Sequence, residues 1–361
     1  MPGLIQRIPK TGVVSLYSRK IDSPPEEIIV NGVPVFGNFN GPFRRLDIRG
    51  IKRPFGDMPI PVFLTDMRII GYSTFIFLTG DYIGLIETCD APLFGFSEIT
   101  FWNRSSGKKL AYRRAVGPFR AKLPMDMNNV RYIFRSKNRK IRLLWNSEKV
   151  SALFSVRGDE SRPDAEASFS LDITDPRSGQ MASVLPLNIR RRCLASWQVT
   201  APLEGCLTIG EKTASAENGI GFFDVRKFYH LFRTKFSRVM GIGSIDGRQV
   251  MFRLFSRISS DEYRYNENVL FVDGKTWPLP PVKITRPYGI NGTWIIQDTE
   301  SMVDLAFTPI SDNKRKMSIF LLRTEYHTIY GTFDGFLLTG KGEKIQLRSF
   351  SGIGKKLMLR L

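Results

Sequence analysis

The chain has 361 residues, of which 42% are hydrophobic, so it is long enough for about two domains and apolar enough to build a core. This composition excludes an intrinsically disordered chain. The 31 Gly and 21 Pro residues are spread along the sequence and the 27 Phe residues favour sheets, which excludes an all-helical bundle. The formal net charge of +19 directs attention to anionic partners.

In chain order, the first 40 residues are expected to form an irregular N-terminal arm, because they contain the run Ser23-Pro24-Pro25 and several Gly and Asn residues. Beyond it, short Gly-containing pairs separate runs rich in Phe, Ile, Val and Tyr, the pattern of β-hairpins. These pairs are Gly80-Asp81, Ser106-Gly107, Asp246-Gly247, Asp273-Gly274 and Lys341-Gly342.

The hairpins fall into two sets, which predict an all-β fold of two antiparallel barrels or sandwiches in tandem with few short helices. A polar stretch at 157–164 and a Pro- and Arg-rich passage at 186–206 lie between the sets. We therefore expect a first β-domain over 41–187 and a second over 188–361.

Basic residues are concentrated between Arg104 and Arg157. This stretch contains 15 of them and only two acidic residues, Asp126 and Glu148. Aromatic residues lie among them, which is typical of a surface that binds nucleic acid or an anionic membrane. The charges also alternate with apolar residues, which is typical of the solvated face of ordinary antiparallel strands. The solvated face of ordinary strands is the simpler of these two interpretations, and we prefer it to a binding surface.

The segment from Asp224 to Val239 has two interpretations. Its apolar residues recur at the spacing of an amphipathic helix that Asp224 would cap, whereas short strands would give the same letters. Asp224 is also a candidate catalytic carboxylate.

The segment 318–330 places Arg323, Glu325 and His327 on one face if it is a single strand. Successive members would be about 6.6 Å apart, close enough to tune one another's protonation. Facing a barrel lumen, Glu325 and His327 would be candidate catalytic groups and Arg323 a ligand-binding group. Facing water, the three would form a salt-bridged row of small energetic value.

Aromatic residues supply further ligand-binding candidates: Tyr229, Trp277 and Trp294, alongside Trp102 and Trp197. Buried aromatic side chains are also ordinary core residues.

Common catalytic motifs are missing from the chain. Gly241–Gly247 departs from the dinucleotide-binding spacing, and we find neither a phosphate loop nor a nucleophile elbow. Three Cys and two His residues cannot form a Cys-rich zinc site, and an odd number of Cys residues far apart in sequence does not indicate a disulfide framework. We expect no metal and no cofactor.

The N-terminus lacks the apolar run of a secretory signal, and the longest uncharged apolar stretch, 69–80, is shorter than the roughly 18 residues of a membrane-spanning helix. The sequence predicts a cytoplasmic protein without a transmembrane segment.

Several motifs resemble the bacterial domain-of-unknown-function family 2804. They are Tyr265–Gly274, Leu279–Lys283, Val303–Pro309 and Gly331-x-Phe333-x-Gly335, with weaker support from Pro34–Gly37, Gly41–Leu46 and Leu93–Phe96. The resemblance implies two lipocalin-like β-domains, similar in outline to carotenoid hydratases, and Asp224 matches a family Asp. After that Asp, the family shows a Gly- and Trp-rich stretch that Val225–Arg233 does not match.

Three functional hypotheses follow. The first is a protein that binds a hydrophobic or amphipathic small molecule in a β-lined pocket. The second is a cofactor-free hydratase, cyclase or isomerase acting on a lipid or isoprenoid substrate. The third is a protein that binds nucleic acid or an anionic membrane through residues 104–157.

Overall fold

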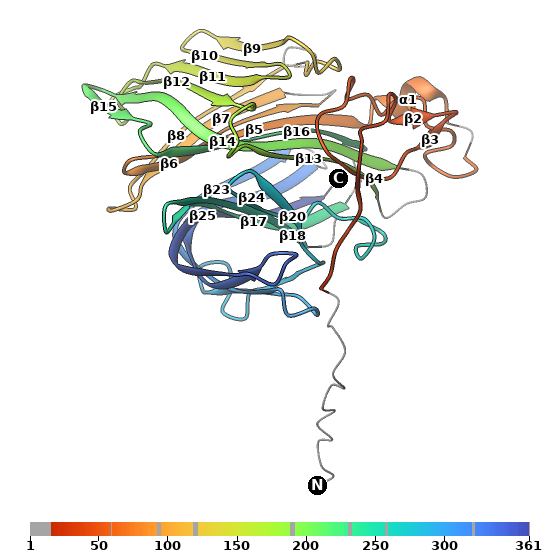
Figure 1. Cartoon of the computed structure of the whole chain (residues 1–361). Helices are drawn as coiled ribbons and strands as arrows, with labels where there is room; N and C mark the ends of the chain where they lie inside the picture. Colours follow the sequence, from red (N-terminus) through yellow and green to blue (C-terminus); the bar gives the residue numbers. More distant parts are fainter. Residues whose placement is uncertain are drawn as a thin grey trace, which may run out of the picture.

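The structure is a computed structural model that describes residues 16–58, 60–91, 95–117, 122–187, 192–229, 233–256, 259–319 and 322–360. In these residues it is mostly strand, and its helix is the short α1 (Val62–Asp66). Two large curled sheets lie one above the other (Figure 1). The predicted fold class, all-β with two antiparallel units in tandem and few short helices, is therefore confirmed.

The first sheet has 14 strands and curls so that β9–β12 lie over β5–β8 (Figure 1). Its continuous antiparallel path runs β8 (Lys109–Val116), β7 (Gly95–Asn103), β6 (Tyr82–Asp90), β5 (Ile69–Thr79), β16 (Gly219–Tyr229), β14 (Cys193–Ile209), β12 (Ala165–Asp172), β11 (Lys149–Val156), β10 (Arg139–Trp145) and β9 (Val130–Ser136). The curl encloses a hydrophobic core, in which the rings of Phe75 and Phe169 stack with centroids 6.1 Å apart.

Short strands complete the first sheet. They are β1 (Ile21–Asp22), β4 (Gly37–Phe39), β13 (Gly179–Pro186) and β15 (Lys212–Ser215). A separate two-stranded ribbon is formed by β2 (Ile29–Val30) and β3 (Val33–Pro34). The described part of the expected irregular arm therefore contains short strands.

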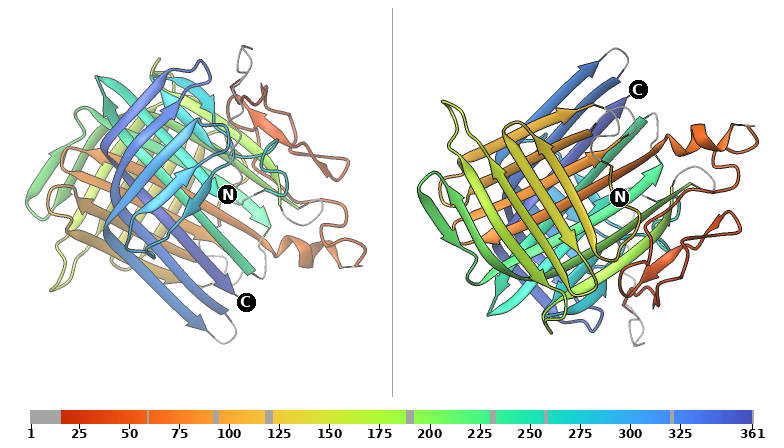
Figure 2. Two further views of the ribbon diagram at one scale, coloured as in Figure 1. Left: turned by 90° about the horizontal axis from the view of Figure 1, so that it is seen from below. Right: turned by 90° about the horizontal axis from the view of Figure 1, so that it is seen from above.

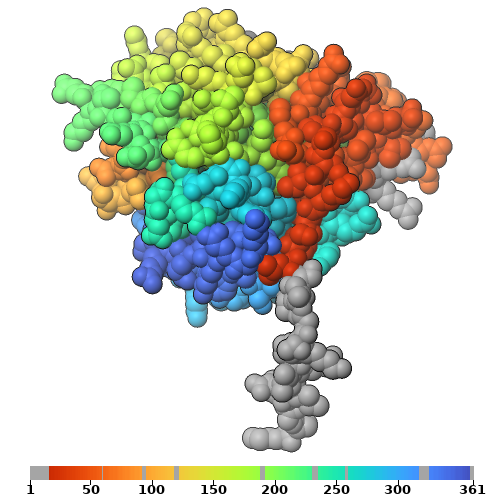
Figure 3. All heavy atoms as spheres, in the orientation of Figure 1, coloured from red at the N-terminus to blue at the C-terminus, as the bar shows by residue number. Residues whose placement is uncertain are grey.

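The N-terminal segment contacts both sheets. β4 pairs with β13 of the first sheet, while Tyr17 packs into the core of the second sheet and donates a hydrogen bond to the carbonyl of Tyr263. Figure 3 shows this segment, in red, running down one side of the molecule across both layers.

The second sheet has nine strands. In order across the sheet they are β20 (Lys275–Pro278), β19 (Val269–Val272), β18 (Arg248–Ser256), β17 (Arg233–Ile245), β25 (Lys344–Arg360), β24 (Leu322–Leu338), β23 (Val303–Ile319), β22 (Trp294–Gln297) and β21 (Lys283–Thr285). This sheet also curls around its own core, where Phe252 of β18 meets Phe333 of β24 with ring centroids 5.0 Å apart.

The predicted hairpin turns are confirmed. Asp246 and Gly247 join β17 to β18 with φ angles of 50° and 77°, the left-handed pair that a two-residue type I′ turn requires. Asp273 and Gly274 join β19 to β20 in the same way, with φ angles of 42° and 76°.

The helix considered for residues 224–239 is not formed. Residues up to Tyr229 belong to β16 and those from Arg233 belong to β17, while 230–232 lie outside the described residues. β16 is buried on both faces, with Phe223 and Val225 in the core of the first sheet and Phe222 against the second sheet. Apolar residues at successive positions of such a strand imitate a helical stripe.

The chain changes sheets after Tyr229 and before Arg233. Strands β14–β16, which span residues 193–229, all pair within the first sheet. This change falls later in the chain than the 187/188 domain boundary expected from the sequence.

The two sheets pack through a third apolar cluster, which includes Ile76 and Phe222 from the first sheet and Met240 and Ile353 from the second. Figure 2 shows the two layers from below and from above. Next to this apolar cluster, the facing surfaces turn polar.

Candidate functional site

A row of polar side chains crosses the face of the first sheet that meets the second. Cross-strand pairing aligns Gln198, Asp224, Thr74, Glu87, Glu98 and Arg113 on β14, β16, β5, β6, β7 and β8. Because directly paired residues of a sheet point to the same face, three carboxylates are presented to the second sheet.

The second sheet carries a row of polar and cationic side chains on the face that meets the first sheet. Arg238, Lys355, Thr328 and Asn313 are cross-strand neighbours on β17, β25, β24 and β23, and Arg315 pairs with Tyr326 two residues further along. The acidic row of one sheet therefore faces cationic side chains of the other.

The carboxylate of Glu87 is buried among groups from the second sheet. Its Oε1 lies 2.7 Å from Nζ of Lys355 and 3.3 Å from a guanidinium nitrogen of Arg238. Tyr326 donates its hydroxyl proton to the same carboxylate at 3.1 Å, and Arg315 lies 3.6 Å from Oε2.

Glu98, the cross-strand neighbour of Glu87, is held in a similar way. Arg315 lies 2.6 Å from its Oε2, and Nε of Arg113 lies 3.1 Å from its Oε1. Thr100 and Asn313 also donate hydrogen bonds to Oε1. We call these groups the Glu87 cluster, and its charged and phenolic members are Glu87, Glu98, Arg113, Arg238, Arg315, Tyr326 and Lys355.

The Glu87 cluster contains four cations and only two carboxylates. Burial of Lys355, which outweighs the attraction of Glu87, lowers the pKa of this amine to about 7. Burial opposes ionisation of Glu87 as well, but Lys355, Arg238 and Arg315 lower its pKa to about 2. Nε of Arg238 and Nε of Arg315 are buried without a hydrogen-bond acceptor among the described residues. The cluster therefore has more cations than carboxylates, and two guanidinium N–H donors in it have no acceptor among the described residues.

Aromatic side chains border the Glu87 cluster on the side away from the apolar inter-sheet cluster. The guanidinium of Arg315 lies 4.8 Å from the ring centroid of Phe96. Tyr72 stands 6.0 Å from Phe96 and stacks on Phe228 at 5.9 Å. These three rings are only partly buried, and they pack on a small cluster that includes Cys89. Cationic and apolar surface therefore meet at this edge.

A second ionic cluster lies between the sheets, around Asp224. Arg226 forms a bidentate pair with Asp224 at 2.7 and 2.8 Å and reaches Glu267 at 3.0 Å. Arg253 of the second sheet contacts Asp224 at 2.7 Å and donates a further hydrogen bond to Oε1 of Gln198 at 3.1 Å. This Asp224 cluster has two carboxylates and two arginines, and both oxygens of Asp224 are engaged.

The predicted pair Glu325 and His327 lies on the other face of β24, within the curl of the second sheet. His327 is held between Asp312, at 2.6 Å from Nδ1, and Glu325, at 3.1 Å from Nε2, and Lys314 pairs with Glu325 at 3.0 Å. Lys314 and His327 lower the pKa of Glu325 to about 2. Each ring nitrogen of His327 therefore lies within hydrogen-bond distance of a carboxylate. The side chain of Arg323 lies outside the described residues.

The predicted aromatic residues lie in three separate places. Tyr229 is in the core of the first sheet and donates a hydrogen bond to the carbonyl of Ile48. Trp294 is in the core of the second sheet beneath Arg286, whose guanidinium is 4.3 Å from its ring centroid, and Trp277 packs at the margin of that core. The structure therefore brings together Glu325 and His327, and separates them from Asp224 and Tyr229.

Sequence reasoning missed the Glu87 cluster. Its signal is a lone charged residue after an apolar run in a strand, as for Glu87 after Leu85-Ile86. The same signal marks Arg253 of the Asp224 cluster, within Phe252-Arg253-Leu254. Such a charge is buried and needs a partner from another element.

Among the described residues, no group of three or more His, Cys, Asp or Glu side chains is arranged to hold a metal ion. Cys89, Cys193 and Cys206 are free thiols. In the same residues, no helix has the length and apolar character needed to cross a membrane.

The two curled antiparallel sheets define the fold class, an all-β protein of two half-barrels in tandem. Within this class, the chain belongs to the family described as domain of unknown function (DUF2804), whose model matches residues 22–360. The structure is also similar to the crystal structure of kievitone hydratase from Nectria haematococca, at 12% sequence identity and a TM-score of 0.44, covering 85% of this chain and 94% of that chain. No curated protein matches the chain.

Proposed function

We propose that the protein binds an amphipathic small molecule with an acidic group between its two sheets. The acidic group pairs with Lys355, Arg238 and Arg315, and the apolar part lies along Tyr72, Phe96 and Phe228. This proposal refines the hypothesis of a hydrophobic ligand in a β-lined pocket.

The excess of cations over carboxylates in the Glu87 cluster is the main observation that supports this proposal. Of the four cations around two carboxylates, Lys355 and Arg238 are buried, whereas the side chain of Arg113 is 39% exposed. Placing unpaired charge in a protein interior is costly. A bound carboxylate would offset this charge and accept from Nε of Arg238 or Arg315, the buried donors that have no acceptor among the described residues.

The partly buried rings at the edge of the cluster support an apolar component of the ligand. Phe96, Tyr72 and Phe228 form a continuous aromatic series, with neighbouring centroids 6.0 and 5.9 Å apart. Burial of an alkyl or aromatic group against them would contribute roughly 25 cal/mol for each Å² removed from water. Acid recognition and apolar burial would then act on one molecule.

Calorimetric titration of the full chain with decanoate and with decanol tests the proposal. We expect decanoate to bind and decanol to bind at least about tenfold more weakly, since a hydrogen-bonded charge contributes roughly 1.5 to 3 kcal/mol. Equal affinity for the two compounds would rule out recognition of an acidic group, and failure of both to bind would overturn the proposed function.

Adjacent lysines of β25 provide a matched pair of variants. Lys355 faces the first sheet, whereas Lys356 pairs with His327 on the opposite face. Lys355→Met should weaken decanoate binding about tenfold or more, and Lys356→Met should leave it unchanged. Glu98→Gln, which removes a competing carboxylate, should strengthen binding. A weaker affinity for Glu98→Gln would contradict the charge argument.

A further inference from the structure

The outer face of the first sheet carries a second basic surface, remote from the Glu87 cluster. On β9 and β10, the outward positions hold Arg131, Arg135, Lys140 and Arg142. Their mutual proximity lowers the pKa of Lys140, with Arg142 as the largest cause and Arg135 and Arg131 contributing. All four belong to the basic stretch 104–157 that the sequence singled out, and none of them belongs to the inter-sheet site.

Cross-strand pairing arranges this face in ordered rows. One row runs Arg135, Lys140, Ser155, Glu166 and Thr208, and the next runs Ile133, Arg142, Leu153, Ser168 and Cys206. Cations occupy the β9–β10 end of the rows, and the acid Glu166 lies toward β12. Aliphatic side chains therefore stand between cations at the basic end.

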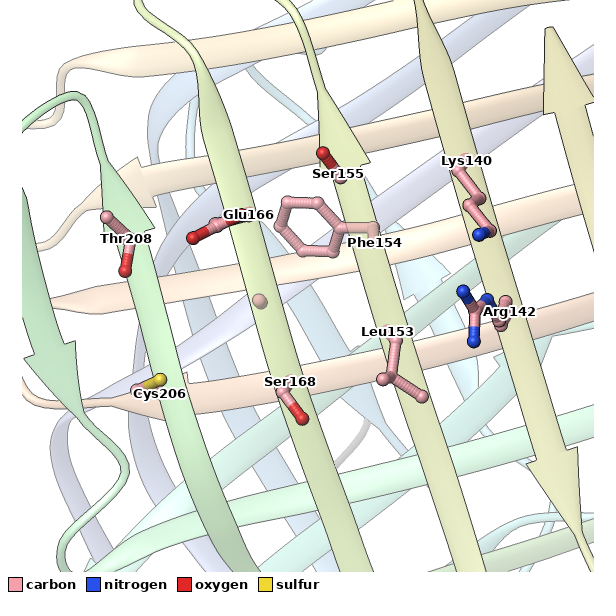
Figure 4. Close-up of a pocket in the computed structure, with 10 residues that line it drawn as sticks. Lys140, Arg142, Leu153, Phe154, Ser155, Glu166, Ser168, Cys206 and Thr208 are labelled. Carbon is pink, nitrogen blue, oxygen red and sulfur yellow. The ribbon is translucent and has the colours of Figure 1, made fainter.

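A depression of about 330 Å³ lies beside the cations (Figure 4). Lys140 and Arg142 form one wall, the small side chains of Ser155 and Ser168 leave the floor open, and Glu166 lies across from Lys140. Viewed from above, the strands β9–β12 form the uppermost layer of the molecule (Figure 2, right). The depression and the cations are therefore presented on an open face.

We propose that the outer face of β9–β11 docks on an anionic lipid bilayer. Arg131, Arg135, Lys140 and Arg142 pair with lipid phosphates, one headgroup enters the depression, and Ile133 and Leu153 contact the interface. We call this the basic outer face. Its assignment does not depend on the proposed function of the inter-sheet site.

The positions of the aromatic residues favour lipid over nucleic acid. Proteins that hold single strands stack bases on exposed aromatic rings. Here Tyr132, Phe134 and Trp145, which alternate with the cations in sequence, are at most 2% exposed and point into the core of the first sheet. The outward positions carry Ile133, which is 37% exposed, and partly buried Leu144 and Leu153. Cations interspersed with aliphatic groups match a headgroup region.

Sedimentation of the full chain with phosphatidylcholine vesicles, alone or with 30% phosphatidylglycerol, tests the proposal. We expect binding to the anionic vesicles only, with a loss of at least tenfold between about 50 and 500 mM salt because charge attraction is screened. Equal binding to both vesicle types, or no binding to either, would overturn it.

Two triple variants with the same change in net charge locate the surface. Arg135→Gln/Lys140→Gln/Arg142→Gln should weaken partitioning about 100-fold, since each cation near an anionic surface contributes roughly fivefold. Lys212→Gln/Lys283→Gln/Lys341→Gln, at exposed positions elsewhere, should retain binding within about threefold. An equal loss in both variants would show that only net charge matters and would reject the basic outer face.

A competition experiment addresses nucleic acid. A 20-base-pair DNA duplex added at equal phosphate concentration should not displace the protein from anionic vesicles. Complete displacement, together with loss of DNA binding in the basic triple variant, would overturn the lipid proposal in favour of nucleic acid. Circular dichroism of both triple variants should match that of the parent chain because all substituted side chains lie at the surface.

Discussion

Two ionic clusters lie between the same pair of sheets, yet their charge balance differs. The Asp224 cluster pairs two carboxylates with two arginines through contacts of 2.7 to 3.0 Å, and Nε of Arg253 is a buried donor without an acceptor among the described residues. The Glu87 cluster surrounds two carboxylates with four cations, and two arginine Nε donors are left over. The two clusters are therefore similarly buried, but the Glu87 cluster has more cations than carboxylates and the Asp224 cluster has equal numbers.

The comparison teaches that charge balance separates a structural ion cluster from a candidate binding site. A balanced buried network fixes how the sheets pack, because removing one member leaves an opposite charge without a partner. An unbalanced network lacks an anion, and a ligand can supply it. Burial alone does not distinguish the two cases.

The largest expected effect is on stability. Arg253→Met removes a fully buried partner of Asp224 and should lower the free energy of unfolding by about 3 to 5 kcal/mol. Lys355→Met removes a surplus cation while Glu87 keeps Arg238 and Arg315, so its change should stay within about 1 kcal/mol. Urea unfolding of the three proteins measures both. If both variants lost the same free energy of unfolding, charge balance would not distinguish the Asp224 cluster from the Glu87 cluster.

A smaller effect is expected from pH. Lys355 has a pKa of about 7 in the folded chain, against 10.5 for an ordinary lysine. The folded state therefore binds fewer protons than the unfolded state between these values, and this residue makes the protein more stable as pH rises from 7 to 10.5. The affinity for an anion that binds the protonated amine should change in the opposite direction and fall as pH rises.

Titration with decanesulfonate measures how the affinity depends on protonation of the protein, because this ligand is anionic at every pH used. Its affinity should fall by up to about tenfold for each pH unit above 7, because the amine must first be protonated. Lys355→Met should remove most of the pH dependence between pH 7 and 9. A parent chain with the same affinity at pH 6.5 and 8.5 would contradict a role for Lys355.

Local signals in the sequence were sufficient to predict the architecture. The pairs Asp246-Gly247 and Asp273-Gly274 have the turn chemistry that a tight hairpin needs, and both form such turns. The segment 224–239 was ambiguous because β16 is buried on both faces, so its apolar residues carry no period of two.

The inter-sheet site could not be predicted in the same way. Glu87 and Lys355 are 268 positions apart, and their contact depends on how two curled sheets are stacked. Likewise, the period of two correctly placed Glu325 beside His327, but Asp312 comes from β23 through a register shift between Pro309 and Ser311. Such a bulge changes which side chains share a face.

The smallest expected effect concerns His327, which lies outside both ionic clusters. His327→Gln removes a side chain held between Asp312 and Glu325 inside the curl of the second sheet, away from the Glu87 cluster. The loss should be about 1 kcal/mol, the value of an ordinary hydrogen bond, because Glu325 keeps Lys314 and remains about one-third exposed to water. Thermal unfolding measures this loss, and decanoate affinity should not change. A decrease in affinity of tenfold or more in a folded variant would move the binding site to the second sheet's interior and restore His327 as a ligand-binding residue.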